Sequence, residues 1–280
     1  MTLRIIALSV VCVMNAAAQS FLGNVTKHIS TGNTVVVIAD SSAIRMMWYT
    51  DDIVRVDFLP SPTTQIESSF VVIQKPDNGI HAEVTETDLA LLVKSSKMQV
   101  RIQKKPLRLF FLDSIGTVLL AEPQSGGLTL NKQFRTLRFV MDPDDHFYGT
   151  GERGTALEKR GQKFVSYNTQ VGNYTVPLAT MNLNVPIVTT NSGYAVYVDN
   201  TYRGEFDFGT VDSSVYSYHV EGGEISYYFI VGATIPEQLE KYTWLTGRQP
   251  LPPRWAFGFI QSKNRYENEK DARLIVETMR

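Results

Sequence analysis

The sequence is nearly free of cysteine: Cys12 is the only one among 280 residues. This residue falls inside an N-terminal segment that we expect to be removed, so the remaining chain would hold no disulfide. An exported protein of this size without disulfides is more typical of a bacterial periplasm or cell surface than of an animal secretory route.

Strong charge and long apolar runs are also missing. The net charge is −1, which excludes a basic field able to attract nucleic acid or an anionic membrane. No internal stretch is apolar for long enough to span a bilayer. The four histidines are scattered, and their spacing supports neither a metal site nor a Ser, His and acid set. We therefore expect no metal and no cofactor.

The first residues predict a secretory signal over residues 1–18. Arg4 gives a positive start, residues 5–14 form a short apolar core, and Ala16-Ala17-Ala18 form a small-residue cleavage site before Gln19. The alternative is a buried N-terminal helix. The order of charge, core and cleavage site favours the signal, and with it a secreted, periplasmic or cell-surface protein, most simply bacterial.

Residues 34–232 predict a mostly β structure. Val54, Val56 and Phe58 alternate with charged residues, and residues 98–103 repeat the alternation. Further strands are expected at residues 194–198 and 225–231, with glycine-rich turns between them. Many short strands separated by such turns are typical of a sandwich or barrel, and the alternation predicts one buried and one wet face for each sheet.

The pattern changes at residue 234. Thr234 and Glu237 form a capping box that predicts a helix ending at Gly247.

After this helix, three prolines make a stiff linker. A buried strand is expected over residues 256–260, and a helix is expected over 267–280. A strand leading into a helix opens a parallel sheet or barrel. A (β/α)₈ barrel needs about 250 residues, so most of it would be missing. The domains predicted are therefore a sandwich over 19–249 and a barrel start over 250–280.

Two motifs have simpler interpretations than their patterns suggest. The run from Gly149 to Gly154 matches the dinucleotide-binding glycine pattern, but no helix signal follows it, so a tight turn between strands is favoured. The run from Asp142 to His146 gathers carboxylates and one histidine. Its spacing fits no metal loop, and a solvated turn rich in Asp and Pro is favoured.

Aromatic and amide residues gather between Tyr148 and Tyr174. Such groups stack on sugars and form hydrogen bonds to them, although an ordinary aromatic-rich loop is an equally good interpretation of the composition. The residues of this group are Tyr148, Phe164, Tyr167, Asn168, Gln170, Asn173 and Tyr174.

Five segments in order resemble glycoside hydrolase family 31. They are Phe147-Tyr-Gly-Thr-Gly-Glu-Arg153, Tyr167-Asn-Thr-Gln170, the stretch from Asn191 to Gly209, Leu245-Thr-Gly-Arg248, and Pro252-Pro-Arg-Trp255 with the run from Gly258 to Tyr266. The resemblance covers the chain from about residue 35 onward. It implies a galactose-mutarotase-like β-sandwich followed by the first strand–helix unit of a truncated (β/α)₈ barrel.

The resemblance also implies retaining chemistry on α-linked glucosides or glucans. An Asp nucleophile and an Asp acid/base flank the anomeric carbon in such enzymes. The family's nucleophile lies in a Trp-x-Asp-Met-Asn-Glu segment, and none of the three tryptophans here has an Asp two positions later. No catalytic residue is therefore assigned, and the catalytic barrel is expected in a further part of the same polypeptide.

The family implies a substrate-binding role for the loop that contains Asn168 and Gln170. The family has an Asp at the second position, which touches the substrate near the leaving group. Gln170 can still form hydrogen bonds with a hydroxyl but offers no charged acceptor. Gln170 thus departs from the ordinary α-glucosidase pattern. A separate set of segments resembles the branch that contains 4-α-glucosyltransferases: Gly151-Glu-Arg153, Lys159-Arg-Gly161, Tyr167-Asn168 and Met181-Asn182.

Two alternatives stay open. The chain could be a stand-alone carbohydrate-binding sandwich, although the predicted barrel strand argues against it. It could also be an aldose mutarotase, which shares the sandwich fold, but that reaction needs a positioned His and Glu, and the scattered histidines do not suggest such a pair.

Overall fold

A computed structural model describes residues 22–40, 42–61, 63–66, 68–130 and 134–279. The predicted signal over residues 1–18, with Cys12, lies outside these residues. The chain divides into two compact units, residues 1–247 and 248–280. Within the described residues no helix is both long enough and apolar enough to cross a membrane.

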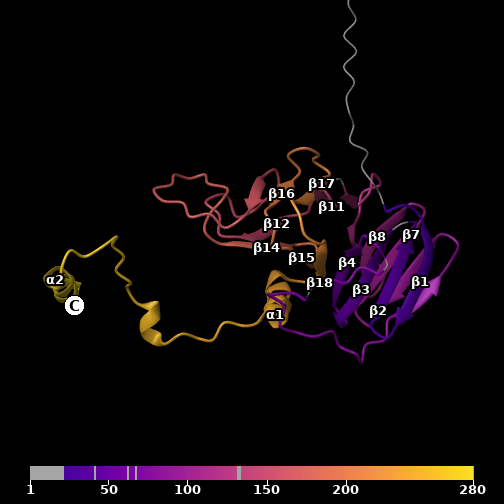
Figure 1. Ribbon diagram of the computed structural model, residues 1–280, viewed down its shortest axis with the longest axis horizontal. Helices are drawn as coiled ribbons and strands as arrows, with labels where there is room; N and C mark the ends of the chain where they lie inside the picture. The colour runs from indigo at the N-terminus through magenta and orange to yellow at the C-terminus, as the bar shows by residue number, and fades with distance from the viewer. Residues whose placement is uncertain (1–21, 41, 62, 67, 131–133, 280) are drawn as a thin grey trace, which may run out of the picture. The chain divides into compact units, whose positions relative to one another are not determined.

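The first unit is built on three antiparallel sheets (Figure 1). The largest has eight strands, in the order β1 (Val25–Thr31), β2 (Thr34–Ala39), β3 (Ser42–Thr50), β4 (Ile53–Leu59), β18 (Ser226–Val231), β15 (Tyr194–Val198), β14 (Asn184–Thr190) and β12 (Phe147–Gly151). The second is β10 (Leu128–Leu130), β11 (Arg135–Val140), β17 (Val215–Val220), β16 (Gly204–Phe208) and β13 (Lys163–Ser166). The third is β5 (Glu83–Glu86), β6 (Ala90–Lys94), β7 (Met98–Lys104), β8 (Leu107–Asp113) and β9 (Val118–Ala121). The mostly β prediction is confirmed.

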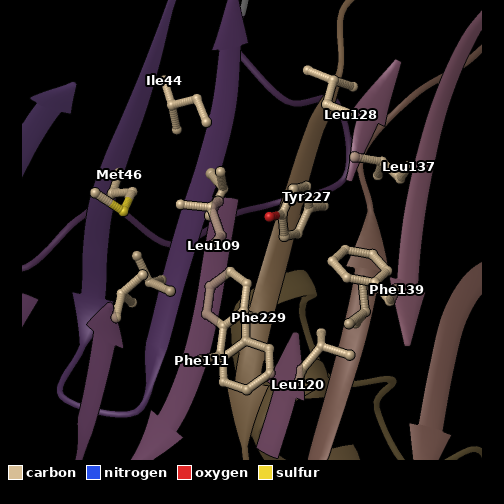
Figure 2. Packing of buried hydrophobic residues seen from close by; sticks show 14 of the residues in the cluster. Ile44, Met46, Leu109, Phe111, Leu120, Leu128, Leu137, Phe139, Tyr227 and Phe229 are labelled. Carbon is tan, nitrogen blue, oxygen red and sulfur yellow. The ribbon is translucent and has the colours of Figure 1, made fainter. Parts of the chain in front are cut away.

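All three sheets contribute to one apolar core (Figure 2). Phe111 of β8 stacks on Phe229 of β18 with ring centroids 4.3 Å apart. Tyr227, also on β18, meets Phe139 of β11 edge to face at 5.7 Å. Because β18 sits in the middle of the eight-stranded sheet, its inward side chains join the two smaller sheets.

The predicted alternation holds for β7 and fails for β4. On β7, Met98, Val100 and Ile102 are fully buried and the intervening residues reach solvent. On β4 every residue is buried, including Arg55 and Asp57, so the expected wet face is wrong there.

Ion pairing explains how β4 buries its charges. The Asp57 carboxylate accepts hydrogen bonds from Arg55 Nε at 2.6 Å and from Arg45 Nη2 at 2.7 Å. The Ser226 hydroxyl also donates to it, at 2.7 Å. A buried charge is tolerated when it is paired and fully hydrogen-bonded, which alternation alone does not reveal.

Helix α1 (Ile235–Thr246) begins and ends as predicted. The Thr234 hydroxyl accepts from the Glu237 backbone nitrogen, and Gly247 ends the helix with a φ of 99°. On this helix the apolar Leu239 is exposed and the polar Gln238 is buried. The Gln238 amide bonds the backbone of Thr190 and Gly232, which satisfies its polar atoms against the eight-stranded sheet.

The second unit holds a 3₁₀ helix η1 (Arg254–Phe257) and helix α2 (Glu269–Met279). The helix expected near the end of the chain is confirmed. The strand expected over residues 256–260 is wrong, because these residues continue from η1 into irregular chain. A strand needs a neighbour to receive its backbone hydrogen bonds, and no other strand is described in this unit.

Candidate functional site

The predicted substrate-binding residues lie on the loop between β13 and β14, residues 167–183. Asn168 is fixed within it, because its Oδ1 accepts hydrogen bonds from the Asn184 backbone nitrogen at 2.7 Å and from Asn184 Nδ2 at 3.0 Å. Gln170 is exposed to solvent. The structure therefore gives the two residues different roles: Asn168 orders the base of the 167–183 loop, and the Gln170 amide faces outward.

Glycines of the Gly149-to-Gly154 run let this loop approach β12. Gly149 and Gly151 have φ of 98° and 89°, and a Cβ on either would lie 2.5 Å or less from a backbone oxygen of Ile187 or Leu183. The run ends one strand and enters irregular chain, and within described residues 152–166 no helix follows. The context required by a dinucleotide-binding motif is therefore missing.

Arg153 anchors the 167–183 loop to the sheets. Its guanidinium donates to the carbonyl oxygens of Ala179 at 2.6 Å, Val165 at 2.9 Å and Thr150 at 2.9 Å. These three carbonyls come from the loop itself, from β13 and from β12. One side chain therefore holds the three segments together. The sequence predicts no such role for Arg153, since its partners are backbone oxygens and leave no pattern of residue types.

The Arg153 guanidinium is partly buried, and no ion pair with a carboxylate is found for it within the described part of the chain. Desolvation lowers the pKa of Arg153 to about 10. Burial also lowers the pKa of Lys159, and the nearby Arg153 charge adds to the effect. Both cations lie over the Phe164 ring, with the Arg153 Cζ 5.2 Å and the Lys159 Nζ 5.3 Å from its centroid. The negative face of the ring favours this arrangement of the two charges.

The aromatic group expected to contact sugars divides into two parts. Phe164 is buried in the core, so its role is packing. Tyr167 and Tyr174 expose 51% and 49% of their surface on the 167–183 loop. The Arg203 guanidinium lies 5.7 Å from the Tyr167 ring centroid. The exposed tyrosines and the Gln170 amide together provide stacking surfaces and hydrogen-bonding groups suited to a sugar.

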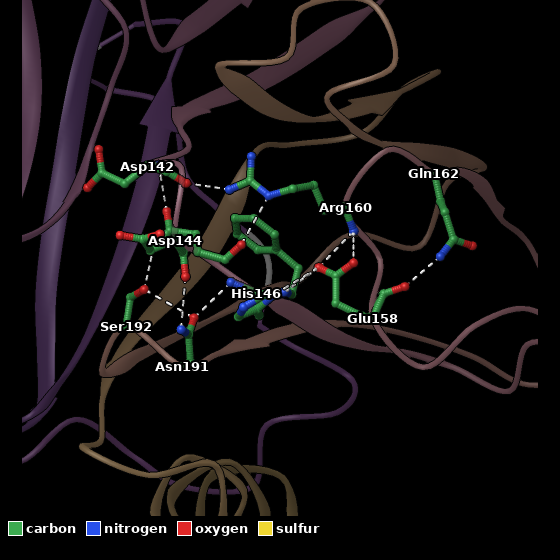
Figure 3. Close-up of polar contacts among 10 residues, drawn as sticks. Asp142, Asp144, His146, Glu158, Arg160, Gln162, Asn191 and Ser192 are labelled. Atoms are coloured by element: carbon green, nitrogen blue, oxygen red, sulfur yellow. Dashed lines mark hydrogen bonds and ion pairs between the residues drawn. The ribbon is translucent and has the colours of Figure 1, made fainter.

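The Asp142-to-His146 turn is held by hydrogen bonds to residues elsewhere in the chain (Figure 3). Arg160 Nε donates to the Asp145 carbonyl at 3.1 Å, and the Asn191 side chain accepts from the His146 backbone nitrogen at 2.8 Å. The described residues contain no group of three or more His, Cys, Asp or Glu side chains arranged for a metal. Asp142, Asp144 and His146 of the turn are exposed, as a solvated turn predicts, whereas Asp145 is buried.

The chain matches a known protein family. The model for the glycosyl hydrolase 31 N-terminal galactose mutarotase-like domain matches residues 43–207. These residues include β12, β13, Arg153 and the whole 167–183 loop.

Known proteins agree with this match. The chain is 36% identical to alpha-glucosidase 2 of Bacillus thermoamyloliquefaciens, over 92% of this chain and 33% of that protein. It is 25% identical to an isomaltosyltransferase of Sporosarcina globispora, over 81% of this chain and 21% of that protein. Among solved structures, a Flavobacterium johnsoniae dextranase complexed with glucose is similar with a TM-score of 0.87 and 26% identity, over 93% of this chain and 32% of that one. The chain thus spans a third or less of the length of these relatives.

Proposed function

Since this chain belongs to glycosyl hydrolase family 31, through its N-terminal galactose mutarotase-like domain, we propose that it is the N-terminal part of a retaining enzyme acting on α-glucosides or α-glucans. The activity would be that of an α-glucosidase or a 4-α-glucosyltransferase. The names of its relatives, an alpha-glucosidase, an isomaltosyltransferase and a dextranase, support this substrate class.

One observation carries the proposal. Arg153 fixes one side of an exposed loop that carries Gln170 and Tyr174 at its surface, which limits the freedom of the loop before any sugar arrives. Holding binding groups in advance lowers the entropy cost of binding. The loop would contribute the leaving-group side of the substrate site, with the Gln170 amide forming hydrogen bonds to a sugar hydroxyl.

The catalytic carboxylates would come from another part of the polypeptide. A retaining enzyme needs two carboxyl groups about 5 Å apart, one to attack the anomeric carbon and one to protonate the leaving oxygen. We assign neither to a residue of this chain. The contribution of the first unit is to orient the sugar that leaves or accepts, which is a positioning role.

The second unit would be the start of the catalytic (β/α)₈ barrel. Its large apolar side chains lie in solvent, and Trp255, Phe259 and Ile260 each expose more than 70% of their surface. Soluble proteins rarely leave such a group unpartnered. These apolar side chains would pack against later elements of that barrel.

The N-terminal segment supports a proposal about location. Residues 1–18 have the charge, apolar core and small-residue end of a secretory signal. The enzyme would therefore be exported to the periplasm or cell surface, where large glucans are met.

The amide at Gln170 bears on whether water or a sugar accepts the glucosyl group. An amide both donates and accepts hydrogen bonds, whereas a carboxylate only accepts. This suits a hydroxyl-rich acceptor sugar bound in several orientations, and it favours transfer of the glucosyl group to a sugar.

The test is to compare products from maltotriose for the complete gene product and its Gln170→Asp variant. The proposal expects longer oligosaccharides from the former and more free glucose from the latter. An unchanged ratio would overturn the assignment of Gln170.

A further inference from the structure

The outer face of one sheet brings together polar side chains that lie far apart in the sequence. Strand β17 pairs with β11 on one side and with β16 on the other, and β16 pairs with β13. The register places His219 opposite Thr136 and opposite Glu205. It places Ser217 opposite Arg138 and opposite Asp207, and Asp207 opposite Lys163.

These seven residues, which we call the β17 face, form two rows across four strands: Thr136, His219 and Glu205 in the first, and Arg138, Ser217, Asp207 and Lys163 in the second. The alternating residues of the same strands, such as Phe206, Phe208 and Tyr216, are buried in the core. The β17 face therefore points away from the core, since neighbouring residues of a strand lie on opposite sides of its sheet.

The β17 face is hollowed. All seven of its residues line a pocket of about 250 Å³, together with Val211, Asp212 and Val215. This volume lies just below the roughly 300–1,000 Å³ of typical small-molecule sites and suits about one sugar ring of a longer chain. Helix α1 packs against strands of the eight-stranded sheet, so it does not cover this pocket.

The side chains of the pocket are positioned by contacts with one another. Lys163 Nζ lies 2.8 Å from Glu205 Oε1, and the Thr136 hydroxyl lies 3.1 Å from His219 Nδ1. Burial lowers the pKa of His219, so the imidazole is neutral at pH 7 and has one donor and one acceptor nitrogen. Asp207 accepts from the Thr210 backbone nitrogen at 2.7 Å, which fixes its carboxylate.

The balance of charge indicates the kind of ligand. Arg138 and Lys163 are positive, while Glu205, Asp207 and Asp212 are negative. A polyanion would meet the three carboxylates, and a polycation would meet the two basic groups. A neutral polyhydroxylated molecule can instead donate to the carboxylates and accept from the guanidinium, ammonium and hydroxyl groups.

We propose that the β17 face is a second saccharide-binding site, separate from the 167–183 loop, that holds a neutral α-glucan chain. Its sugar class follows from the proposed function of this chain, whereas its existence depends only on the β17 face. The site is a binding surface with no catalytic role. It would keep a long glucan attached to the protein while another part of the glucan occupies the loop.

The experiment is a titration of the 280-residue chain with maltotriose, followed by amide NMR. The proposal predicts that maltotriose changes the amide chemical shifts of residues on β11, β16 and β17. In Arg138→Gln the Kd should be about tenfold higher, the loss of affinity expected when hydrogen bonds to one charged group are removed. Arg101→Gln is the matched control, because Arg101 is an exposed arginine on β7 of a different sheet. This control should bind as the unaltered chain does.

Each other outcome counts against the site. Shifts confined to residues 167–183 would leave the proposed function standing and remove the second site. Shifts at β17 that Arg138→Gln leaves unchanged would contradict the assigned residues. Binding of maltotriose at neither place would count against both proposals, and binding of a sulfated oligosaccharide in preference to maltotriose would contradict the neutral ligand.

A thermal melt of each variant identifies loss of folding, and His219→Gln provides a second variant if Arg138→Gln is unfolded.

Discussion

The Arg153 guanidinium lies 2.6 Å from the carbonyl oxygen of Ala179, 26 residues further along the chain. This contact joins the end of β12 to the far side of the 167–183 loop. Because the same side chain also bonds Val165, it links the loop that carries Gln170 to β13.

Replacing Arg153 by Ala should therefore loosen the loop while leaving the sheets in place. Loss of a set of charged hydrogen bonds to buried carbonyls costs about 2 kcal/mol of local stability. Amide hydrogen exchange should accelerate across residues 168–183 by roughly 30-fold, the factor that this energy implies. Exchange in β7 serves as the internal reference, and equal acceleration there would show general destabilisation instead of a released loop.

Glycine at position 149 should be irreplaceable for a steric reason. A Cβ there would lie 2.5 Å from the Ile187 oxygen on the paired strand β14, and the φ of 98° adds strain. Gly161 also has a positive φ, of 73°, but a Cβ there meets nothing within 4 Å. Urea unfolding should show Gly161→Ala losing about 1 kcal/mol and Gly149→Ala clearly more. Equal losses would mean that backbone strain alone determines both.

Asp57 should be the most sensitive charged residue of the first unit. It is fully buried between Arg45 and Arg55, so Asp57→Asn leaves buried positive charge unneutralised. The expected loss is about 3–5 kcal/mol in the free energy of unfolding. Glu86→Gln, which removes a surface ion pair with Lys104, should hardly change the midpoint of a thermal melt. A small effect at Asp57 would show that the pair is not desolvated.

Stability should fall as the pH rises from about 4.5 to 7, because of Glu122. Its Oε2 accepts one hydrogen bond, from the Leu109 backbone nitrogen at 2.8 Å, and burial raises its pKa to about 7. The folded state thus holds this proton more tightly than the unfolded state. Its contribution is complete below pH 4.5 and is lost as pH rises through 7, a change of roughly 3 kcal/mol.

Urea unfolding at pH 5 and pH 8 measures this contribution. The Glu122→Gln variant keeps the shape and carries no titrating proton, so its stability should fall less between the two pH values than that of the unaltered chain. An identical fall in both proteins would show that other groups cause the pH dependence.

Alternation and capping signals predicted the parts of the fold that depend on neighbouring residues. The strands of β7 and β15 and both ends of α1 belong to this class. The burial of Arg55 and Asp57 could not be predicted, because the strands next to β4 supply further partners of the Asp57 carboxylate. The expected strand over 256–260 failed for the same reason, since a strand exists only where another strand pairs with it.

The sequence predicts which loop could bind a sugar, but it does not predict the contacts that hold this loop. Tyr167, Asn168 and Gln170 followed from a short motif, whereas Arg153 bonds carbonyl oxygens that any residue could provide. His219 and Glu205 are separated by 14 positions in the sequence, and only the pairing of β16 with β17 sets them opposite each other. The histidines that look scattered in the sequence therefore include one within a polar cluster.

The most direct test of the account is an activity comparison on maltotriose. The 280-residue chain would be assayed beside the product of its gene read past codon 280. We expect the longer product to release glucose or rearrange the oligosaccharide with retention at the anomeric carbon, and the 280-residue chain to do neither. Turnover of maltotriose by the 280-residue chain alone, or a reading frame that stops directly after Arg280, would contradict the claim that this is the N-terminal part of a family 31 enzyme.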